Sequence, residues 1–160
     1  MKRQDNANYV RNPDFKDGFQ DWRVDAPAQT VEQEVYKNRS AAQVDRRLSK
    51  EVALSQTLVP QENFRAGSYE CGFLAASTGT GPVNGIRMDV YAQYLDGSRE
   101  VLLIERAYPG EDWMESTGIL LLRGAATSIV VLLRIDMPGE QAVSGHLHVS
   151  GVVCRLIRRR

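Results

Sequence analysis

The 160-residue sequence has no long apolar segment and no excess of either charge. Its longest apolar run, residues 129–133, is far shorter than the roughly 20 residues that a membrane-spanning helix needs. Lysine and arginine together number 20, as do aspartate and glutamate, so no overall field attracts nucleic acid or an anionic membrane. The first ten residues also lack the apolar core of a secretory signal. We therefore expect no membrane partner and no specific nucleic-acid partner.

Cysteine is scarce as well. Cys71 and Cys154 are the only two, and neither belongs to a Cys-x-x-Cys pair or to a Cys/His cluster with metal-ligand spacing. Both stand in apolar, strand-like segments. This placement favours two buried thiols, with a disulfide between neighbouring strands as the alternative.

Motifs of catalysis are missing too. The chain contains no Gly-x-Ser-x-Gly, no phosphate-binding loop and no His-Glu-x-x-His sequence. Glu111, Asp112 and Glu115 gather beside Trp113, but a glycosidase needs two carboxyl groups that face each other across a cleft. We interpret these acids as solvated loop residues and predict that the protein is not an enzyme.

Strand-like segments separated by turn signals run through the chain, without a long amphipathic helix. This punctuation is typical of an antiparallel all-β domain, and about nine strands in one chain predict a two-sheet β-sandwich of jelly-roll type. We expect one domain over 1–160, with an N-terminal arm at 1–8, the jelly roll at 9–157 and a basic tail at 158–160. The candidate strands are 30–36, 41–48, 52–59, 68–76, 86–95, 100–106, 118–122, 127–135 and 147–157.

The clearest alternation lies between residues 86 and 95. Its apolar members share one face and are assigned to the core, whereas its polar members share the other face and are assigned to solvent. Asp96-Gly97 then predicts a hairpin to the segment 100–106. The core-facing set is Ile86, Met88, Val90, Ala92 and Tyr94, and the solvent-facing set is Arg87, Asp89, Tyr91 and Gln93.

Three other segments differ in how clearly their sequence predicts a strand and its position. Residues 128–135 are largely apolar on both faces, which is typical of a central strand of a sandwich. Residues 37–51 mix charges with small residues, so a short helix and a charged edge strand are equally compatible with them. His146 and His148 share one face of a strand. We interpret them as exposed edge histidines, because no third metal ligand accompanies them.

The segment 12–22 reads Asn-Pro-Asp-Phe-Lys-Asp-Gly-Phe-Gln-Asp-Trp. Asn12-Pro13 favours a turn, and Phe15 and Trp22 are then able to fold back onto a sandwich as core plugs. Later segments follow in the order Ser40-Ala-Ala-Gln-Val, Leu54-Ser-Gln-Thr-Leu, Gly67-Ser-Tyr, Trp113 and Gly124-Ala125. The opening and this order resemble carbohydrate-binding modules of the galactose-binding-like, jelly-roll fold, over residues 9–157. The resemblance implies a structural, closing role for Phe15, Trp22 and Trp113.

Many modules of that family hold a structural calcium between an acidic residue of the opening and an aspartate near the last strand. Here Lys16 follows Phe15, and Ser150-Gly151 stand where the aspartate would fall. Calcium requires several oxygen ligands. Asp14 and Asp17 remain in the opening, but we expect no metal and no other cofactor.

A ligand site is expected on the polar face of the segment 86–95. Arg87, Asp89, Tyr91 and Gln93 stand there, and Glu70 joins them if its strand is adjacent. A tyrosine ring is able to pack on a sugar, and the arginine, amide and carboxylate groups are able to bind its hydroxyls. The same mixture also suits a protein contact.

Two functions are compatible with these features. The first is a structural interaction module, such as a phage capsid decoration protein, which joins a protein assembly or a homo-oligomer and resides in the virion or the host cytoplasm. The second is a polysaccharide-binding module of a larger secreted protein, which would be extracellular. The departures at the calcium positions and the absent signal favour the first, and the resemblance favours the second. Arg155 and the tail 158–160 are interpreted as solvated or protein-binding.

Overall fold

The computed structural model describes residues 7–27, 30–139 and 141–159. This part of the chain contains ten strands and no helix that could span a membrane. The strands are β1 (Arg23–Asp25), β2 (Val31–Tyr36), β3 (Arg39–Asp45), β4 (Val52–Leu58), β5 (Gly67–Ser77), β6 (Ile86–Tyr94), β7 (Arg99–Ala107), β8 (Met114–Leu122), β9 (Ala126–Ile135) and β10 (His146–Arg159).

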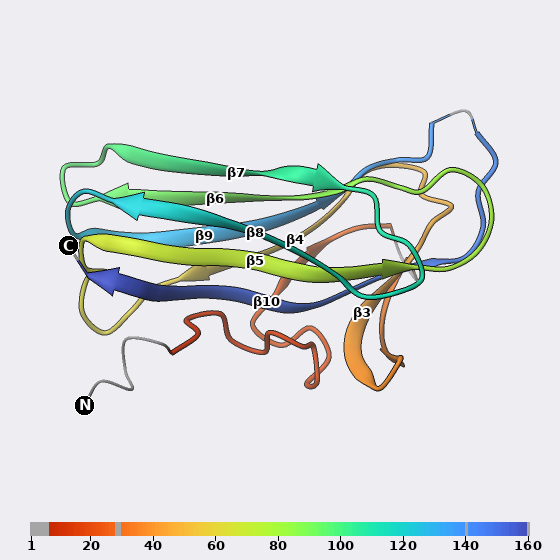
Figure 1. Ribbon diagram of the computed structural model, residues 1–160, viewed down its shortest axis with the longest axis horizontal. Coiled ribbons are helices and arrows are strands. Elements are labelled where there is room, and N and C mark those ends of the chain that lie inside the picture. The colour runs from red at the N-terminus through yellow and green to blue at the C-terminus, as the bar shows by residue number, and fades with distance from the viewer. Residues whose placement is uncertain (1–6, 28–29, 140, 160) are drawn as a thin grey trace.

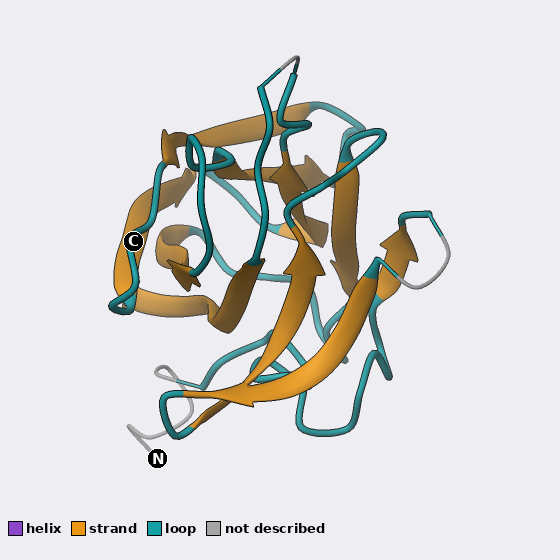
Figure 2. Ribbon diagram, turned by 90° about the vertical axis from the view of Figure 1, so that its right-hand side faces the viewer, coloured by secondary structure: helices purple, strands orange, loops and turns teal. Residues whose placement is uncertain are grey.

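The strands form two antiparallel sheets of five strands each. The first sheet, called sheet A, has the order β1-β4-β9-β6-β7, and the second, called sheet B, has the order β2-β3-β10-β5-β8. Strands β5 to β10 run lengthwise through the molecule in Figure 1, whereas β3 runs across that direction, and Figure 2 shows the sheets from one end. The predicted two-sheet jelly-roll sandwich is confirmed. The predicted central position of 128–135 is confirmed as well, because β9 is the middle strand of sheet A.

The core lies between the inner faces of the two sheets. Alternate residues of each central strand face inward, and the apolar ones are buried, as Val90 and Ala92 are in β6 and Val149 is in β10. Tyr94, which was assigned to the core, packs against it in a partly buried position. Its hydroxyl donates to Glu100 and accepts from the amide of Arg123.

The opening segment closes one side of this core without forming a strand. The Asn12 side chain donates to the carbonyls of Gly18 and Gln20, and the Asn12 carbonyl accepts from the Trp22 indole at 2.9 Å. These bonds fold the segment into a compact loop. The structure places Phe15 and Trp22 in the core, with ring centroids 4.9 Å apart.

The ambiguous region 37–51 contains an interior strand, and neither a helix nor an edge strand. Lys37 and Asn38 both have positive φ, as the two central residues of a type I′ hairpin turn do. This turn pairs β2 with β3, and β3 pairs on its other side with β10. The edge strand on this side of sheet B is therefore β2, and the opposite edge strand is β8.

The two predicted ends differ from the prediction where the structure describes them. Residues 1–6 and 160 lie outside the described part. The side chain of Asn8, assigned to the arm, donates to the carbonyl of Val152 and accepts from the amide of Cys154. Strand β10 continues to Arg159, so residues 158 and 159 belong to sheet B and not to a tail.

Cys71 and Cys154 are directly opposed across β5 and β10. Both are buried free thiols, with sulfur atoms 3.8 Å apart. The contact with Cys154 and burial raise the pKa of the Cys71 thiol. The two side chains therefore act as apolar core residues in this structure.

Candidate functional site

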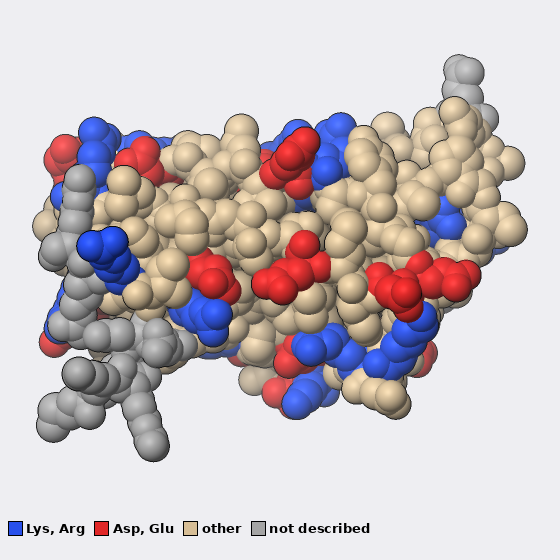
Figure 3. All heavy atoms as spheres, viewed as in Figure 1, with Lys and Arg blue, Asp and Glu red and all other residues tan. Residues whose placement is uncertain are grey.

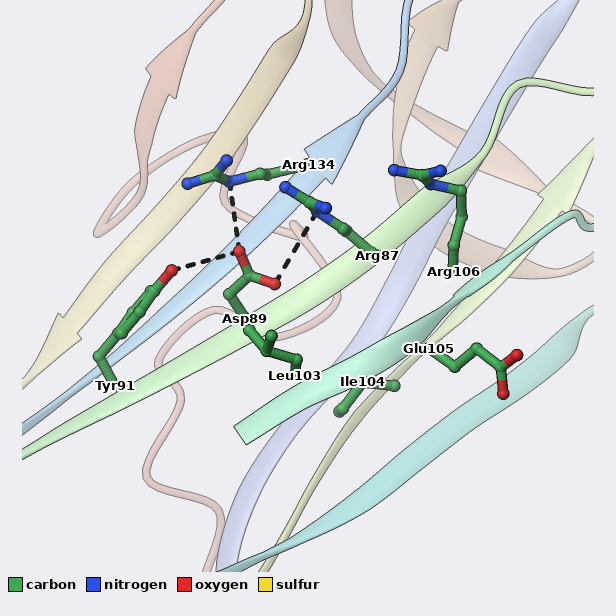
Figure 4. Close-up of a pocket in the computed structure, with 8 residues that line it drawn as sticks. All are labelled: Arg87, Asp89, Tyr91, Leu103, Ile104, Glu105, Arg106 and Arg134. Carbon is green, nitrogen blue, oxygen red and sulfur yellow. Dashed lines mark hydrogen bonds and ion pairs between the residues drawn. The ribbon is translucent and has the colours of Figure 1, made fainter. Parts of the chain in front are cut away.

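A groove crosses the outer face of sheet A. It has a volume of about 470 Å³ and is lined by side chains from β6, β7 and β9. In Figure 4, side chains from β6 and β9 converge on Asp89, namely those of Arg87, Tyr91 and Arg134. The lining residues are Arg87, Asp89, Tyr91, Leu103, Ile104, Glu105, Arg106 and Arg134.

The centre of the groove is one carboxylate between two guanidinium groups. Asp89 is 3% exposed, and its oxygens lie 3.4 Å from Arg134 Nε and 3.9 Å from Arg87 Nε. The hydroxyl of Tyr91 donates to Asp89 Oδ2 at 3.3 Å. A charge-assisted bond of this type is about 2.7–2.9 Å long, so both arginines are near Asp89 without being tightly bound to it.

Both arginines therefore retain unused hydrogen-bonding capacity. Each guanidinium has five N–H donors, and Arg87 Nε is buried without any hydrogen-bond partner among the described residues. The side chains of Arg87 and Arg134 are about one-third exposed, at 35% and 32%. An acceptor in the groove is thus able to reach them.

The other charged groups of the groove are arranged differently. Arg106 forms a 2.8 Å ion pair with Asp136. In Figure 4, Glu105 extends away from Asp89 and its two arginines. On the molecular face seen in Figure 3, acidic and basic groups are interspersed. The uncompensated positive charge of the groove is therefore local to Arg87 and Arg134.

A second depression continues the groove along β6. It has a volume of about 220 Å³ and is lined by Gln93, Arg99 and Ser128, among others. Tyr91 lines both depressions, so they meet at its ring. The distance from Arg87 to Gln93 along an extended strand is about 20 Å, which gives the site an elongated shape.

Four of the five predicted ligand-binding residues meet at this surface, and one does not. Arg87, Asp89, Tyr91 and Gln93 line the two depressions. Glu70 belongs to β5 in sheet B, where its carboxylate lies 2.9 Å from Arg155 Nη2. The predicted adjacency of Glu70 was wrong, because β6 pairs with β7 and β9 and not with β5.

Several lining residues were not predicted from the sequence. Arg134 was recognised only as the end of an apolar strand, and Leu103 and Arg106 were assigned to a strand without a site. Asp96-Gly97 predicts a hairpin that places β7 beside β6. This signal was sufficient to assign Leu103 to the same surface as Tyr91. Arg134 reaches the groove because β9 pairs with β6. These two strands are distant in the chain, so no local sequence pattern predicts their pairing.

The outer face of sheet B is covered where His148 lies. His148 is 3% exposed on the central strand β10, so the predicted exposed edge position was wrong. Its ring stacks on that of Tyr36 at a centroid distance of 4.0 Å, and Trp113 contacts it edge-on at 6.5 Å. Neither ring nitrogen has a hydrogen-bond partner among the described residues. Burial, with a smaller contribution from His146, lowers the pKa of His148 from 6.5 to about 4.

Trp113 does not belong to the core, contrary to the closing role that was expected for it. It is partly exposed and packs on Tyr36 at a centroid distance of 5.7 Å. The hydroxyl of Tyr36 donates to the carbonyl of Glu111, and Lys37 Nζ contacts Asp112 at 2.8 Å. Trp113 is therefore part of a loop that covers the outer face of sheet B.

The residues at the expected calcium position do not fit a cation. Asp14 Oδ1 accepts from Arg39, from the hydroxyl of Ser150 and from the amide of Gly151, at 2.8–3.0 Å. The guanidinium of Arg39 thus supplies the positive charge next to this carboxylate. Within the described ranges, no group of three or more metal-ligating side chains occurs. Hydrogen bonds connect the opening to the last strand here.

Comparisons with known proteins identify the fold. No protein-family model and no curated protein sequence matches the chain. A family 61 carbohydrate-binding module, TmCBM61, solved with β-1,4-galactotriose, is 15% identical with a TM-score of 0.64, over 94% of this chain and 99% of that one. The xylan-binding CBM22-1 domain of Paenibacillus barcinonensis Xyn10C is 12% identical with a TM-score of 0.63, over 98% and 99%. The chain has the galactose-binding-like jelly-roll fold of carbohydrate-binding modules.

A phage protein shares this fold in one part. The enzymatically active domain of tailspike protein 4 of bacteriophage CBA120 is 12% identical with a TM-score of 0.70. The match covers 94% of this chain and only 21% of the tailspike chain. The TM-scores show that this chain shares the fold of carbohydrate-binding modules, whereas identities of 12–15% do not identify a ligand. The residues of the groove are therefore the basis for assigning a ligand class.

Proposed function

We propose that this protein is a non-catalytic carbohydrate-binding module that holds a polysaccharide in the groove on the outer face of sheet A. The observation that carries the proposal is the pair of depressions that meet at Tyr91. A polymer chain is elongated, and so is this surface. The extracellular location expected for a module of a larger secreted protein is part of the proposal.

The chemistry of the lining supports a sugar ligand. The partly exposed ring of Tyr91 and the side chain of Leu103, which is 66% exposed, offer apolar surface to the C–H groups of a sugar ring. The side chains of Arg87, Arg134 and Gln93 offer donors and acceptors to its hydroxyls. Ligand sites are commonly built in this way, with apolar walls and a few polar groups that fix orientation.

Affinity electrophoresis through gels that contain galactan, xylan or an acidic polysaccharide tests this proposal. We expect at least one polymer to retard the protein, and Tyr91→Ala to remove the retardation. Tyr91→Phe keeps the ring and is expected to retain most of it. Tyr36→Ala truncates the same residue type on sheet B and serves as the matched control. The proposal fails if no polymer retards the protein, or if Tyr91→Ala and Tyr36→Ala behave alike.

A second candidate is a structural protein on the surface of a phage particle, acting in a protein assembly or as a homo-oligomer. Among the comparisons, the match to one part of the phage tailspike favours it. Sedimentation of the purified protein provides the measurement. A monomer that binds polysaccharide through Tyr91 supports the first candidate, whereas an oligomer that ignores sugars supports the second.

A further inference from the structure

We infer that the polysaccharide bound by this groove is acidic, and that Arg87 and Arg134 bind the carboxylate of a uronate unit. The inference rests on the proposed function and specifies its ligand class. Its basis is the centre formed by Arg87, Asp89 and Arg134. A neutral sugar leaves the charge of this centre uncompensated, and a uronate neutralises it.

The charge of the centre is the first argument. Two guanidinium groups share the single carboxylate of Asp89, so the centre carries one excess positive charge. The remaining cation of the groove, Arg106, is paired with Asp136 at 2.8 Å. Glu105 is turned away from the centre in Figure 4. A ligand carboxylate therefore finds positive charge without a competing anion that faces it.

The accessibility of the three groups is the second argument. Asp89 is 3% exposed and lies at the floor of the groove. The side chains of Arg87 and Arg134 are about ten times more exposed, at 35% and 32%. A ligand thus contacts the arginines before Asp89, and the attraction of two nearer guanidinium groups exceeds the repulsion of one covered carboxylate.

The unused donors are the third argument. Arg87 Nε is buried and has no hydrogen-bond partner among the described residues, and a buried donor of this kind costs free energy until it is paired. Arg134 Nε lies 3.4 Å from Asp89, which is long for a charge-assisted bond. Because both Nε atoms lie toward Asp89, a planar carboxylate of a ligand meets the other N–H groups of the two guanidinium forks, whose side chains are 35% and 32% exposed. The ring of the neighbouring Tyr91 is placed to pack on the sugar unit that bears this carboxylate.

The decisive experiment compares one polymer in two charge states. Polygalacturonate carries a carboxylate on each sugar, and its methyl ester is the same chain without the charge. Isothermal titration calorimetry with both polymers at low and high salt measures the preference. We expect the acid to bind about tenfold tighter than the ester or more, because hydrogen bonds to charged groups are the stronger ones. Salt should weaken the binding of the acid and leave that of the ester unchanged.

Two variants assign the preference to the arginines. Arg134→Gln keeps the length of the side chain and removes its charge, and we expect it to reduce the affinity for polygalacturonate about tenfold. Arg158→Ala removes an exposed positive charge from sheet B and should have no effect. Asp89→Asn removes the internal anion with almost no change of shape. It should raise the ratio of the affinity for the acid to that for the ester about threefold.

The outcomes separate this inference from the proposed function. Equal binding of acid and ester that depends on Tyr91 would retain the glycan-binding function and overturn the acidic ligand. A preference for the acid that Arg158→Ala reduces as much as Arg134→Gln does would also overturn it, since the charge would then be non-specific. Retention by none of the polymers would overturn both. If Arg134→Gln fails to fold, the gain expected for Asp89→Asn still decides the matter.

Discussion

Asp89 and His148 occupy comparable positions on the two sheets, but the side chains that surround them are of opposite kinds, polar around Asp89 and aromatic around His148. Each is a polar residue on the outer face of an interior strand, and each is 3% exposed. Asp89 is surrounded by Arg87, Arg134 and Tyr91, which supply opposite charge and a hydrogen bond. His148 is covered by the rings of Tyr36 and Trp113 and has no polar partner among the described residues.

The difference shows how the outer face of one strand stays open around a polar residue while that of another is covered by aromatic rings. On sheet A, the groups around Asp89 are polar and leave a groove that a ligand can enter. On sheet B, the loop that ends at Trp113 is bound to the β2–β3 hairpin through Tyr36 and Lys37, and together with Tyr36 it covers His148. A buried charge requires polar neighbours, whereas a neutral imidazole is compatible with aromatic ones. The two residues therefore predict different responses to pH and mutation.

The largest effect is expected from protonation of His148. Its pKa is about 4 in the folded protein, against 6.5 for an ordinary histidine, so the unfolded chain binds the proton first as the pH falls. The stabilisation is complete above pH 6.5 and is lost as the pH decreases toward 4. The loss amounts to about 3 kcal/mol of the free energy of unfolding. Urea denaturation between pH 7.5 and 4 measures it.

His148→Phe is the control for this effect, because it keeps a flat ring against Tyr36 and does not titrate. Acidic residues contribute equally to the pH dependence of both proteins, so the difference between them isolates His148. Identical pH profiles for the two proteins would contradict the prediction.

An intermediate effect is expected from removal of the Asp89 charge. Asp89→Leu leaves Arg87 and Arg134 without their shared counter-charge and should reduce the free energy of unfolding by about 2 kcal/mol. The cost remains moderate because both arginines are partly exposed to water. Asp89→Asn retains an acceptor for Tyr91 and should cost less. Urea denaturation at pH 7 measures the free energy of unfolding of both variants. Equal losses for Asp89→Leu and Asp89→Asn would mean that the acceptor retained by asparagine contributes nothing to stability.

The smallest effect is expected from Tyr36→Phe. This change removes the bond from the tyrosine hydroxyl to the carbonyl of Glu111 and keeps the ring on His148. Because that bond is exposed to solvent, the expected cost is about 0.5 kcal/mol. The pKa of His148, measured by NMR, should stay near 4, whereas Tyr36→Ala should raise it toward 6.5. A pKa that rises equally in both variants would show that the hydroxyl, and not the ring, excludes water.

Much of the fold was predictable because local patterns carry it. The alternation over 86–95 assigned each side chain of β6 to its face, and Asp96-Gly97 identified the hairpin to β7. In contrast, Lys37-Asn38 is an unusual pair for a type I′ turn. The β2–β3 hairpin was therefore missed. The candidate strand 41–48 overlaps β3, but the interior position of β3 was not predicted.

The candidate site was predictable only along one strand. Arg87, Asp89, Tyr91 and Gln93 alternate within β6, so their shared face follows from the geometry of a strand. Glu70 was placed incorrectly because nothing in a strand's own sequence states which sheet it joins. His148 was interpreted as an exposed edge residue, which was wrong, because it lies on the central strand β10 and is covered by Tyr36 and by the loop before β8, both distant in sequence.

The sequence by itself determined the class of the fold, the composition of the core and the order of polar side chains along each strand. These properties depend on near neighbours, through the two-residue period of a strand and the backbone preferences of turns. Only the tertiary structure decided that Arg134 meets Asp89, that Glu70 lies on the other sheet and that His148 is covered. Such contacts join segments far apart in the chain, and the packing of the whole sandwich selects among the many pairings that each strand's pattern allows.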